Sequence, residues 1–421
     1  MNELRGINRR RALTALGAVP IAGLAPQTRA AEDGAAAPSD KPRELAPMEA
    51  DMGTLYPDIE RLVAANRPSH SFLDSRFQSL EDWKRRGREL AWESFGYRPA
   101  TVDLNPKVVD RQDLGEFVRE KVLFSTTPQF RVAAYVHIPK NRTGRGPAIV
   151  DLHSHGGMFL FGKEKVIDFG RNHPAMTEYH KGNYGGRPTT TALVRRGYVV
   201  VTIDAFMFGE RRLIMDEDLK YGWERSRYSV EDVKHLNARC ASKEDTLAKS
   251  LTLAGIAWNG VVAWDDMRTV DYLLTRPEVD PKRIGCVGVS FGGYRTLFLA
   301  GLDERIAAAC VVGFMSTIKP MARRHIDTHS WVHFVPSLHR YMDWPDVVGM
   351  MAPKPLMVQQ CRQDGLFPLT GMRESLERIA AIYEKAGVKS HFDGRFYDGG
   401  HRFDVPMQED AFDWFDRHLK A

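Results

Sequence analysis

The chain is poor in cysteine, with four among 421 residues. Cys286, Cys310 and Cys361 lie in apolar, strand-like runs, whereas Cys240 lies in a polar stretch. This set does not match the spacing of a disulfide framework. We therefore expect free thiols, mostly buried as small hydrophobic side chains, and a fold that does not depend on disulfide bonds.

The chain also lacks a long hydrophobic run. The apolar stretch 12–24 is too short for a permanent membrane-spanning helix. It follows Arg9, Arg10 and Arg11 and precedes small residues around Ala30, a pattern typical of a secretory signal. The paired arginines favour the twin-arginine route. We expect residues 1–30 to be a signal peptide and the protein to be periplasmic or secreted, without stable membrane insertion.

A strong charge of one sign is missing as well. The chain has 59 basic and 54 acidic residues, a net charge of +5. Residues 1–30 hold five arginines and one glutamate, a net charge of +4, which leaves +1 for the rest of the chain. The sequence therefore gives no reason to expect a nucleic-acid partner.

The chain predicts one catalytic domain after a short linker. Residues 31–47 are rich in Ala, Pro, Asp and Glu and are typical of a flexible linker. We expect residues 48–421 to form a single domain, with a helical N-terminal extension at 48–100. Segments 156–187 and 208–253 are too long for ordinary connections, and 315–344 is expected to be a lid-like insertion over the site.

Apolar runs and helical segments alternate along the domain, which predicts a doubly wound, mostly parallel α/β sheet. We expect helices on both faces of this sheet. Eight strands are expected, at 117–124, 130–139, 147–153, 198–204, 284–289, 308–312, 355–359 and 390–397, the first two antiparallel at one edge. The helices between and after them are expected at 190–196, 257–275, 294–300, 373–386 and 408–419.

A candidate nucleophile follows the strand at 284–289. Gly288-Val289-Ser290-Phe291-Gly292 is a Gly-x-Ser-x-Gly motif between a buried strand and a helix. This strand–turn–helix arrangement is the nucleophile elbow, which exposes a serine at a helix N-terminus. The motif by itself also occurs as a glycine-rich packing turn, so the assignment depends on a matching base and carboxylate.

Both partners are present at the expected places. Serine needs a base to become a nucleophile, and His401 lies in a glycine-containing loop after the last strand. Asp364 lies in the loop after the preceding strand and is the candidate carboxylate that orients His401. The order Ser290, Asp364, His401 is the one that α/β-hydrolases use.

Residues 130–419 resemble the dienelactone-hydrolase and acetylxylan-esterase-like branch of the α/β-hydrolases. The resemblance rests on residues 152–157, Asp204, 208–211, Asp265, Asp266, 277–284, the serine motif, Asp364 and His401. It implies a cofactor-free carboxylester hydrolase, and export suggests deacetylation of plant polysaccharides. Dienelactone hydrolases use cysteine as nucleophile, so Ser290 makes lactone hydrolysis less favoured.

The oxyanion of an acyl-transfer reaction needs two amide donors. Phe291, directly after the serine, is expected to supply one. The second is expected in the loop 152–157, which can be aligned in two frames. One frame makes His155 the donor, which we favour, and the other makes it Gly156 or Gly157. Many relatives have glycine where this chain has Ser154, and this leaves the second donor open.

A metal site is the alternative chemistry. His153 and His155 are two residues apart on a strand end and could chelate a metal. His325, His329 and His333 are four apart and could share a helix face. The simpler interpretation of these histidines is hydrogen bonding to backbone or substrate, so no metal or other cofactor is expected.

Substrate contacts are expected from four residues of the long insertions, namely Tyr184, Arg187, Trp331 and Trp344. The expected partner is a small-molecule or polysaccharide ester, with removal of acetyl groups as the leading reaction. A uronate or pectin methyl esterase, another carboxylesterase, a serine peptidase of the prolyl-oligopeptidase type, a metal-dependent hydrolase and a non-catalytic binding protein remain alternatives. The 129 residues before Phe130 are too few and too helical for the β-propeller of such peptidases.

Overall fold

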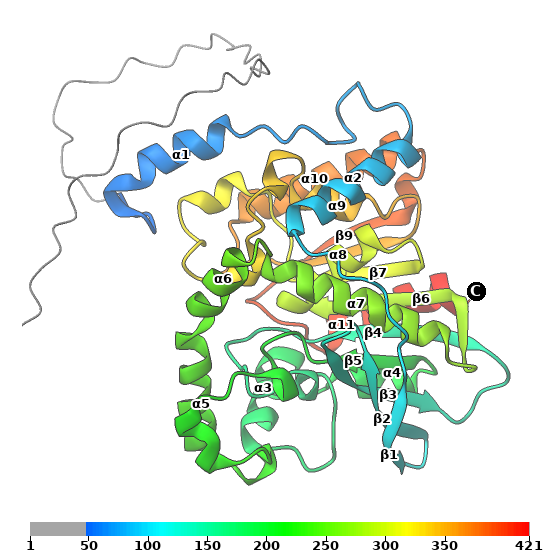
Figure 1. Ribbon diagram of the computed structural model, residues 1–421. Coiled ribbons are helices and arrows are strands. Elements are labelled where there is room, and N and C mark those ends of the chain that lie inside the picture. Colours follow the sequence, from blue (N-terminus) through cyan, green and yellow to red (C-terminus); the bar gives the residue numbers. More distant parts are fainter. Residues whose placement is uncertain (1–47, 421) are drawn as a thin grey trace, which may run out of the picture. The chain divides into compact units, whose positions relative to one another are not determined.

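A nine-stranded sheet forms the centre of the computed structural model, which describes residues 48–420 (Figure 1). The predicted signal peptide 1–30 and linker 31–47 lie outside the described residues. The strand order is β1-β2-β3-β5-β4-β6-β7-β8-β9. The strands are β1 (Lys107–Asp113), β2 (Phe117–Ser125), β3 (Arg131–Pro139), β4 (Gly146–Leu152), β5 (Val199–Ile203), β6 (Val279–Val289), β7 (Ile306–Val312), β8 (Leu356–Cys361) and β9 (Phe392–Tyr397).

The sheet has the predicted α/β-hydrolase topology. At one edge of the sheet, the neighbouring pairs β1–β2, β2–β3 and β3–β5 are antiparallel. From β5 onwards, the strands β5, β4, β6, β7, β8 and β9 are parallel to one another. The mostly parallel fold is thus confirmed, with one strand more than predicted. All seven residues of β1 are exposed. The strand therefore carries no hydrophobic alternation by which the sequence could reveal it.

Helices cover both faces of the sheet, as its parallel strands require. Every residue of β5 and β8 is buried, which is possible only when both faces are covered. One group of helices, α2, α7, α8, α9 and α10, packs together, while α4 and α11 pack against the sheet as a second group (Figure 1). Their bounds are α2 (Leu80–Phe95), α4 (Thr189–Arg195), α7 (Trp258–Leu274), α8 (Phe291–Leu302), α9 (Trp344–Gly349), α10 (Leu369–Lys385) and α11 (Val405–Phe415).

The remaining helices lie in the N-terminal extension and in the long connections. α1 (Tyr56–Ala65) precedes α2, whose N-terminus is capped by the Ser79 side chain. α3 (Pro174–Tyr184) lies within segment 156–187, and α5 (Val230–Ser242) and α6 (Glu244–Leu253) lie within 208–253. The lid-like segment 315–344 contains three short 3-10 turns, of which Trp331–His333 is one.

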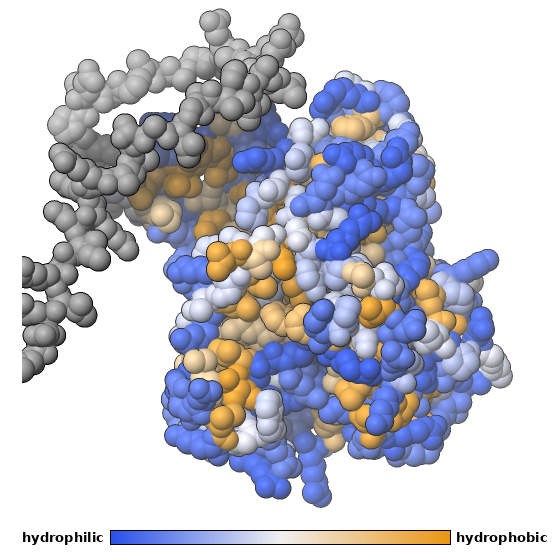
Figure 2. Space-filling model, in the orientation of Figure 1, coloured by the Kyte–Doolittle hydropathy of each residue, from blue (hydrophilic) through white to orange (hydrophobic). Residues whose placement is uncertain are grey.

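The cysteines are free and buried, Cys240 included. One face of the molecule is mostly hydrophilic, with separate hydrophobic patches (Figure 2). Within residues 48–420, no helix is long and apolar enough to cross a membrane.

Candidate active site

Ser290 occupies a strained backbone turn between β6 and α8. Its φ is 62° and its ψ is −125°, a conformation that costs a non-glycine residue free energy. Such strain persists only where the surrounding structure imposes it. The turn places Ser290 directly before the N-terminus of α8, as the serine motif predicts.

Two glycines allow this turn to press against the end of β4. A Cβ atom on Gly288 would lie 2.4 Å from the carbonyl oxygen of Leu152, and one on Gly292 would lie 2.0 Å from the same oxygen. No side chain fits at either position without moving the backbone. The close approach sets Ser290 beside the loop that follows Leu152.

His401 and Asp364 form the second half of the site. His401 Nδ1 lies 2.6 Å from Asp364 Oδ2, and the amide of Leu366 donates to Oδ1 at 2.9 Å. The Asp364 side chain is fully buried, so both of its oxygens are held in place. His401 Nε2 is also buried and has no hydrogen-bond partner within residues 48–420. This nitrogen is available to a neighbouring hydroxyl.

Ser290 and His401 line one cavity of about 350 Å³. Its walls come from the loop after β4, from α3 and α6, from the lid-like segment and from the loop after β8. The other lining residues are Ser154, His155, Gly156, Gly157, Tyr179, Asn183, Glu244, Val289, Phe314, Asp327, Thr328, His329, Ser330, His333, Leu366 and Phe367.

The loop after β4 is held by Lys165, a residue that no sequence motif singles out. The Lys165 amine is buried and donates to the carbonyl oxygens of Ser154 and His155, each at 2.7 Å. The C=O and N–H of one trans peptide unit point in opposite directions. The amides of His155 and Gly156 therefore both point away from Lys165. Gly156 has φ of 53° and leaves no room for a Cβ beside the Tyr179 hydroxyl.

A family comparison agrees with this arrangement. The Abhydrolase family model matches residues 56–413. The chain belongs to the Abhydrolase family. The predicted resemblance to the α/β-hydrolases, with acetylxylan esterases among the structural neighbours, is confirmed at this level.

Individual relatives of this abhydrolase are distant. It is 25% identical over 305 residues to "Putative hydrolase YtaP" of Bacillus subtilis, covering 72% of this chain and 88% of the relative. A "putative acetyl xylan esterase" of Bacteroides fragilis has a similar structure, with a TM-score of 0.61, 20% identity and coverage of 82% and 84% of the two chains. A glucuronoyl esterase of Solibacter usitatus gives a TM-score of 0.59, 16% identity and coverage of 83% and 97%.

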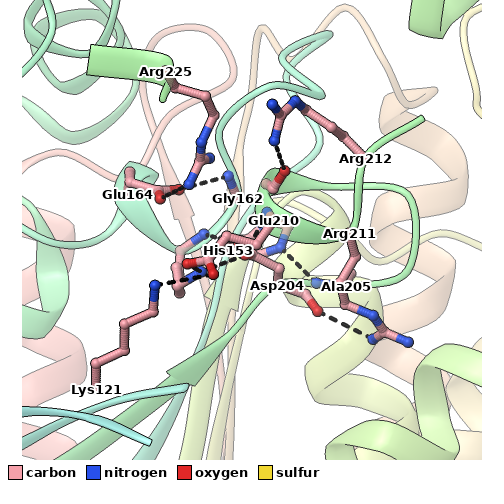
Figure 3. A network of polar contacts seen from close by, with 12 residues as sticks. Lys121, His153, Gly162, Glu164, Asp204, Ala205, Glu210, Arg211, Arg212 and Arg225 are labelled. Atoms are coloured by element: carbon pink, nitrogen blue, oxygen red, sulfur yellow. Dashed lines mark hydrogen bonds and ion pairs between the residues drawn. The ribbon is translucent and has the colours of Figure 1, made fainter. Parts of the chain in front are cut away.

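A network of ion pairs and hydrogen bonds surrounds Asp204 at the end of β5 (Figure 3). Asp204, just after β5, accepts the amides of Lys163 and Glu210 at 2.8 and 2.9 Å and also contacts the Lys163 ammonium. Burial alone would raise the pKa of Asp204, but the charges of Lys163 and Arg225 and the hydrogen bond from Lys163 together bring the pKa below its usual value. Glu210 bridges Lys163 and Lys121 at 2.8 and 3.0 Å. The network ties segment 156–187 to the end of β5.

The histidine pair proposed for a metal is committed to other contacts. His153 Nε2 accepts the amide of Ala205 at 3.0 Å, so Nδ1 carries the proton and donates to the Ser154 carbonyl at 2.9 Å. Burial lowers the pKa of His153 well below its usual value, so the ring is neutral. Both nitrogens are thus engaged without a metal. Within residues 48–420, no three His, Cys, Asp or Glu side chains are grouped to hold a metal ion.

His155 belongs to the cavity and not to a pair with His153. Its Nδ1 accepts the amide of Gly157 at 3.1 Å, and its Nε2 therefore donates to Glu244 Oε1 at 3.2 Å. The same oxygen of Glu244 accepts the hydroxyl of Ser330 from the lid-like segment. Glu244, at the start of α6, thus joins the loop after β4 to the lid.

His325, His329 and His333 do not share a helix face, because the segment between the 3-10 turns is irregular. His329 Nδ1 donates to the His325 carbonyl at 2.6 Å. His329 and His333 line the cavity, whereas His325 does not belong to the lining set. Burial lowers the pKa of His329 to about 4 and that of His333 well below its usual value. Both rings are therefore neutral at pH 7.

The four predicted substrate-contact residues are all outside this lining set. Tyr184 and Trp344 are buried, with Tyr184 3.2 Å from the Ser154 hydroxyl and Trp344 packed on Phe314. Arg187 pairs with Glu409 on α11 at 2.5 Å. Trp331 is 52% exposed and contacts Phe334. Tyr184 and Trp344 are thus taken up by packing and Arg187 by an ion pair, and a substrate contact of the exposed Trp331 stays a prediction.

The cavity instead uses residues that carry no local motif. Tyr179 and Asn183 come from α3 and Glu244 from α6, both within the long segments expected to shape the site. Ser154 donates to or accepts from the Tyr179 hydroxyl at 2.7 Å. The serine that departs from the usual glycine is therefore held by α3. Only the three-dimensional arrangement brings these groups together.

Proposed function

We propose that this abhydrolase is a serine carboxylester hydrolase that removes acetyl groups from plant polysaccharides or oligosaccharides. The observation that carries the proposal is the 2.6 Å contact between His401 and Asp364 in the cavity that also contains Ser290. The strained turn at Ser290 and the unpartnered His401 Nε2 support it. The acetyl xylan and glucuronoyl esterases among the structural neighbours favour a sugar ester as substrate.

In the proposed mechanism, His401 Nε2 takes the proton of Ser290 as its hydroxyl oxygen attacks the ester carbonyl. The amides of Phe291 and His155, with Gly156 as a further candidate, stabilise the oxyanion. His401 then protonates the departing sugar hydroxyl. Water, activated by the same imidazole, releases the acid from Ser290. Asp364 keeps the proton on Nδ1 and stabilises the imidazolium form.

We also propose that the protein is exported by the twin-arginine route, since residues 1–30 have the composition of such a signal. The alternative prolyl-oligopeptidase function has less support. Residues 48–129 contain α1, α2, β1 and β2 and no propeller.

The test measures acetate and methanol released from acetylated xylan, methylated pectin and small aryl acetates. Wild type is expected to release acetate from xylan, and Ser290→Ala is expected to release almost none. Ser337→Ala, a change at an exposed serine, serves as the control. Release of methanol without acetate would contradict the deacetylase proposal and indicate a methyl esterase. Undiminished activity of Ser290→Ala would contradict the serine mechanism.

A further inference from the structure

The acidic and basic side chains that line the catalytic cavity, histidines aside, are all carboxylates. Its lining residues within the described part of the chain include two carboxylates, Glu244 and Asp327, and no lysine or arginine. Asp327 is on the exposed surface, whereas the side chain of Glu244 is 18% exposed. Glu244 is therefore the better shielded negative charge at the site.

The histidines of the cavity do not offset this charge. His155 accepts an amide proton at Nδ1 and so has a neutral ring. His329 and His333 are neutral because burial lowers their pKa values, to about 4 for His329. His401 must be neutral before it can act as a base. Within residues 48–420, the lining residues thus provide no lysine or arginine, and His329 and His333 are neutral rings, so the wall offers no fixed positive charge to pair with Glu244.

The two buried lysines beside the loop after β4 serve other groups. Lys165 directs its amine to the two carbonyl oxygens of the loop and is absent from the lining set. Lys163 is paired with Asp204 and Glu210. Neither is positioned to bind a carboxylate of the substrate.

The bonding of Glu244 fixes its charge in place. Oε1 accepts from both His155 and Ser330, and charged acceptors make the stronger hydrogen bonds. The carboxylate is thus held at the cavity wall by hydrogen bonds from two other segments, the loop after β4 and the lid-like segment.

We propose that Glu244 selects substrates by charge, so that the site favours acetyl esters of uncharged alcohols and disfavours those with a carboxylate near the ester. For a polysaccharide, the preferred substrate is therefore an acetylated neutral sugar. An acetylated sugar that lies beside a free uronate is disfavoured. The proposal rests on the proposed hydrolysis at Ser290 and narrows its substrate class.

The expected size of the effect follows from Coulomb's law. Two negative charges within a small cavity, in surroundings of intermediate dielectric constant, repel each other enough to change kcat/KM by on the order of tenfold. Because part of the cavity is open to solvent, salt should weaken this repulsion.

The test compares two acetyl esters of matched shape, 4-acetoxybenzamide and 4-acetoxybenzoate, which differ in the charge of the leaving group. The measured quantity is the ratio of their kcat/KM values. Glu244→Gln is expected to shift this ratio about tenfold towards the benzoate. Glu244→Asp keeps the charge and is expected to retain most of the wild-type preference. Raising the salt concentration should shift the ratio in wild type and leave it nearly constant in Glu244→Gln.

Glu231→Gln is the matched control, because this carboxylate has an 83% exposed side chain and does not line the cavity. A loss of contact with His155 would slow both substrates and leave their ratio unchanged. An unchanged ratio in Glu244→Gln, or an equal shift in Glu231→Gln, would overturn charge selection. Ser290→Ala separates the two proposals, since retained hydrolysis of both esters in that variant would instead refute the proposed function.

Discussion

Gly292 and Leu152 are in such close contact that a Cβ atom on Gly292 would lie 2.0 Å from the Leu152 carbonyl oxygen. The contact joins the first turn of α8 to the end of β4. The serine turn and the loop 153–157 are therefore fixed relative to each other by backbone packing, before any side chain contributes.

Gly292→Ala should destabilise the fold, because neither the Leu152 backbone nor the turn can yield without disturbing the sheet. We expect a loss of about 1–3 kcal/mol in the free energy of unfolding, measured by urea denaturation. Gly182→Ala is the control. Gly182 lies in α3 with no atom near the position of its Cβ, and alanine there should stabilise by about 0.5–1 kcal/mol. Equal effects at both positions would contradict the packing argument.

Asp364→Asn should leave the protein folded and slow ester hydrolysis. The amide can donate to His401 Nδ1, which would place the imidazole proton on Nε2, where it cannot accept from Ser290. A fall in kcat on the order of 10⁴-fold is expected, with a smaller change in KM. Steady-state kinetics with an aryl acetate measures it, and a circular dichroism spectrum like that of wild type checks the fold. A kcat within tenfold of wild type would show that Asp364 does not orient the base.

Lys165→Met should impair the loop that we propose carries the second oxyanion donor. Methionine preserves length but leaves the carbonyls of Ser154 and His155 without their shared donor. If that loop supplies an oxyanion amide, kcat should fall by about 10²-fold while KM changes little. Lys181→Met, at an exposed position of α3, should have no such effect. Unchanged kcat in Lys165→Met would argue that the loop is held by other contacts.

Asp151, at the end of β4, should make stability depend on pH. Burial raises its pKa to about 7, although the hydroxyls of Thr189 and Thr190 donate to it and oppose the rise. Between about pH 4 and pH 7 the unfolded chain ionises this carboxyl while the folded protein keeps it protonated. The folded state therefore binds more protons, and its stability falls as pH rises through this window.

Asp151→Asn removes that contribution. Between pH 4 and pH 7, wild type should lose about 2–4 kcal/mol more unfolding free energy than the variant. Urea denaturation at several pH values gives both curves, with Asp216→Asn as an exposed-carboxylate control. A constant difference between Asp151→Asn and wild type across the window would mean that Asp151 does not titrate there.

The sequence predicted those parts of the structure that local patterns determine. Apolar runs located eight of the nine strands, and glycine spacing around Ser290 predicted the turn. The candidate positions of Asp364 and His401 followed from chain order, and the structure places their side chains in contact. β1 was missed because a fully exposed strand pairs through its backbone and leaves no hydrophobic pattern.

The walls of the cavity could not be predicted in the same way. Trp344 and Tyr184 are residue types that often contact substrates, but both are buried. Their burial depends on neighbours that are far away in sequence. Glu244 has no local motif, and its position becomes evident only when α6 meets the loop after β4 and Ser330. Lys165 likewise acts through two carbonyl groups whose orientation no sequence pattern reports.

The central claim is that Ser290 is the nucleophile, and covalent labelling with a fluorophosphonate followed by peptide mass mapping tests it most directly. The predicted result is one adduct, on the peptide that contains Ser290, formed in step with the loss of esterase activity and absent from Ser290→Ala. Labelling of another residue, or full activity after Ser290 is labelled, would contradict the claim.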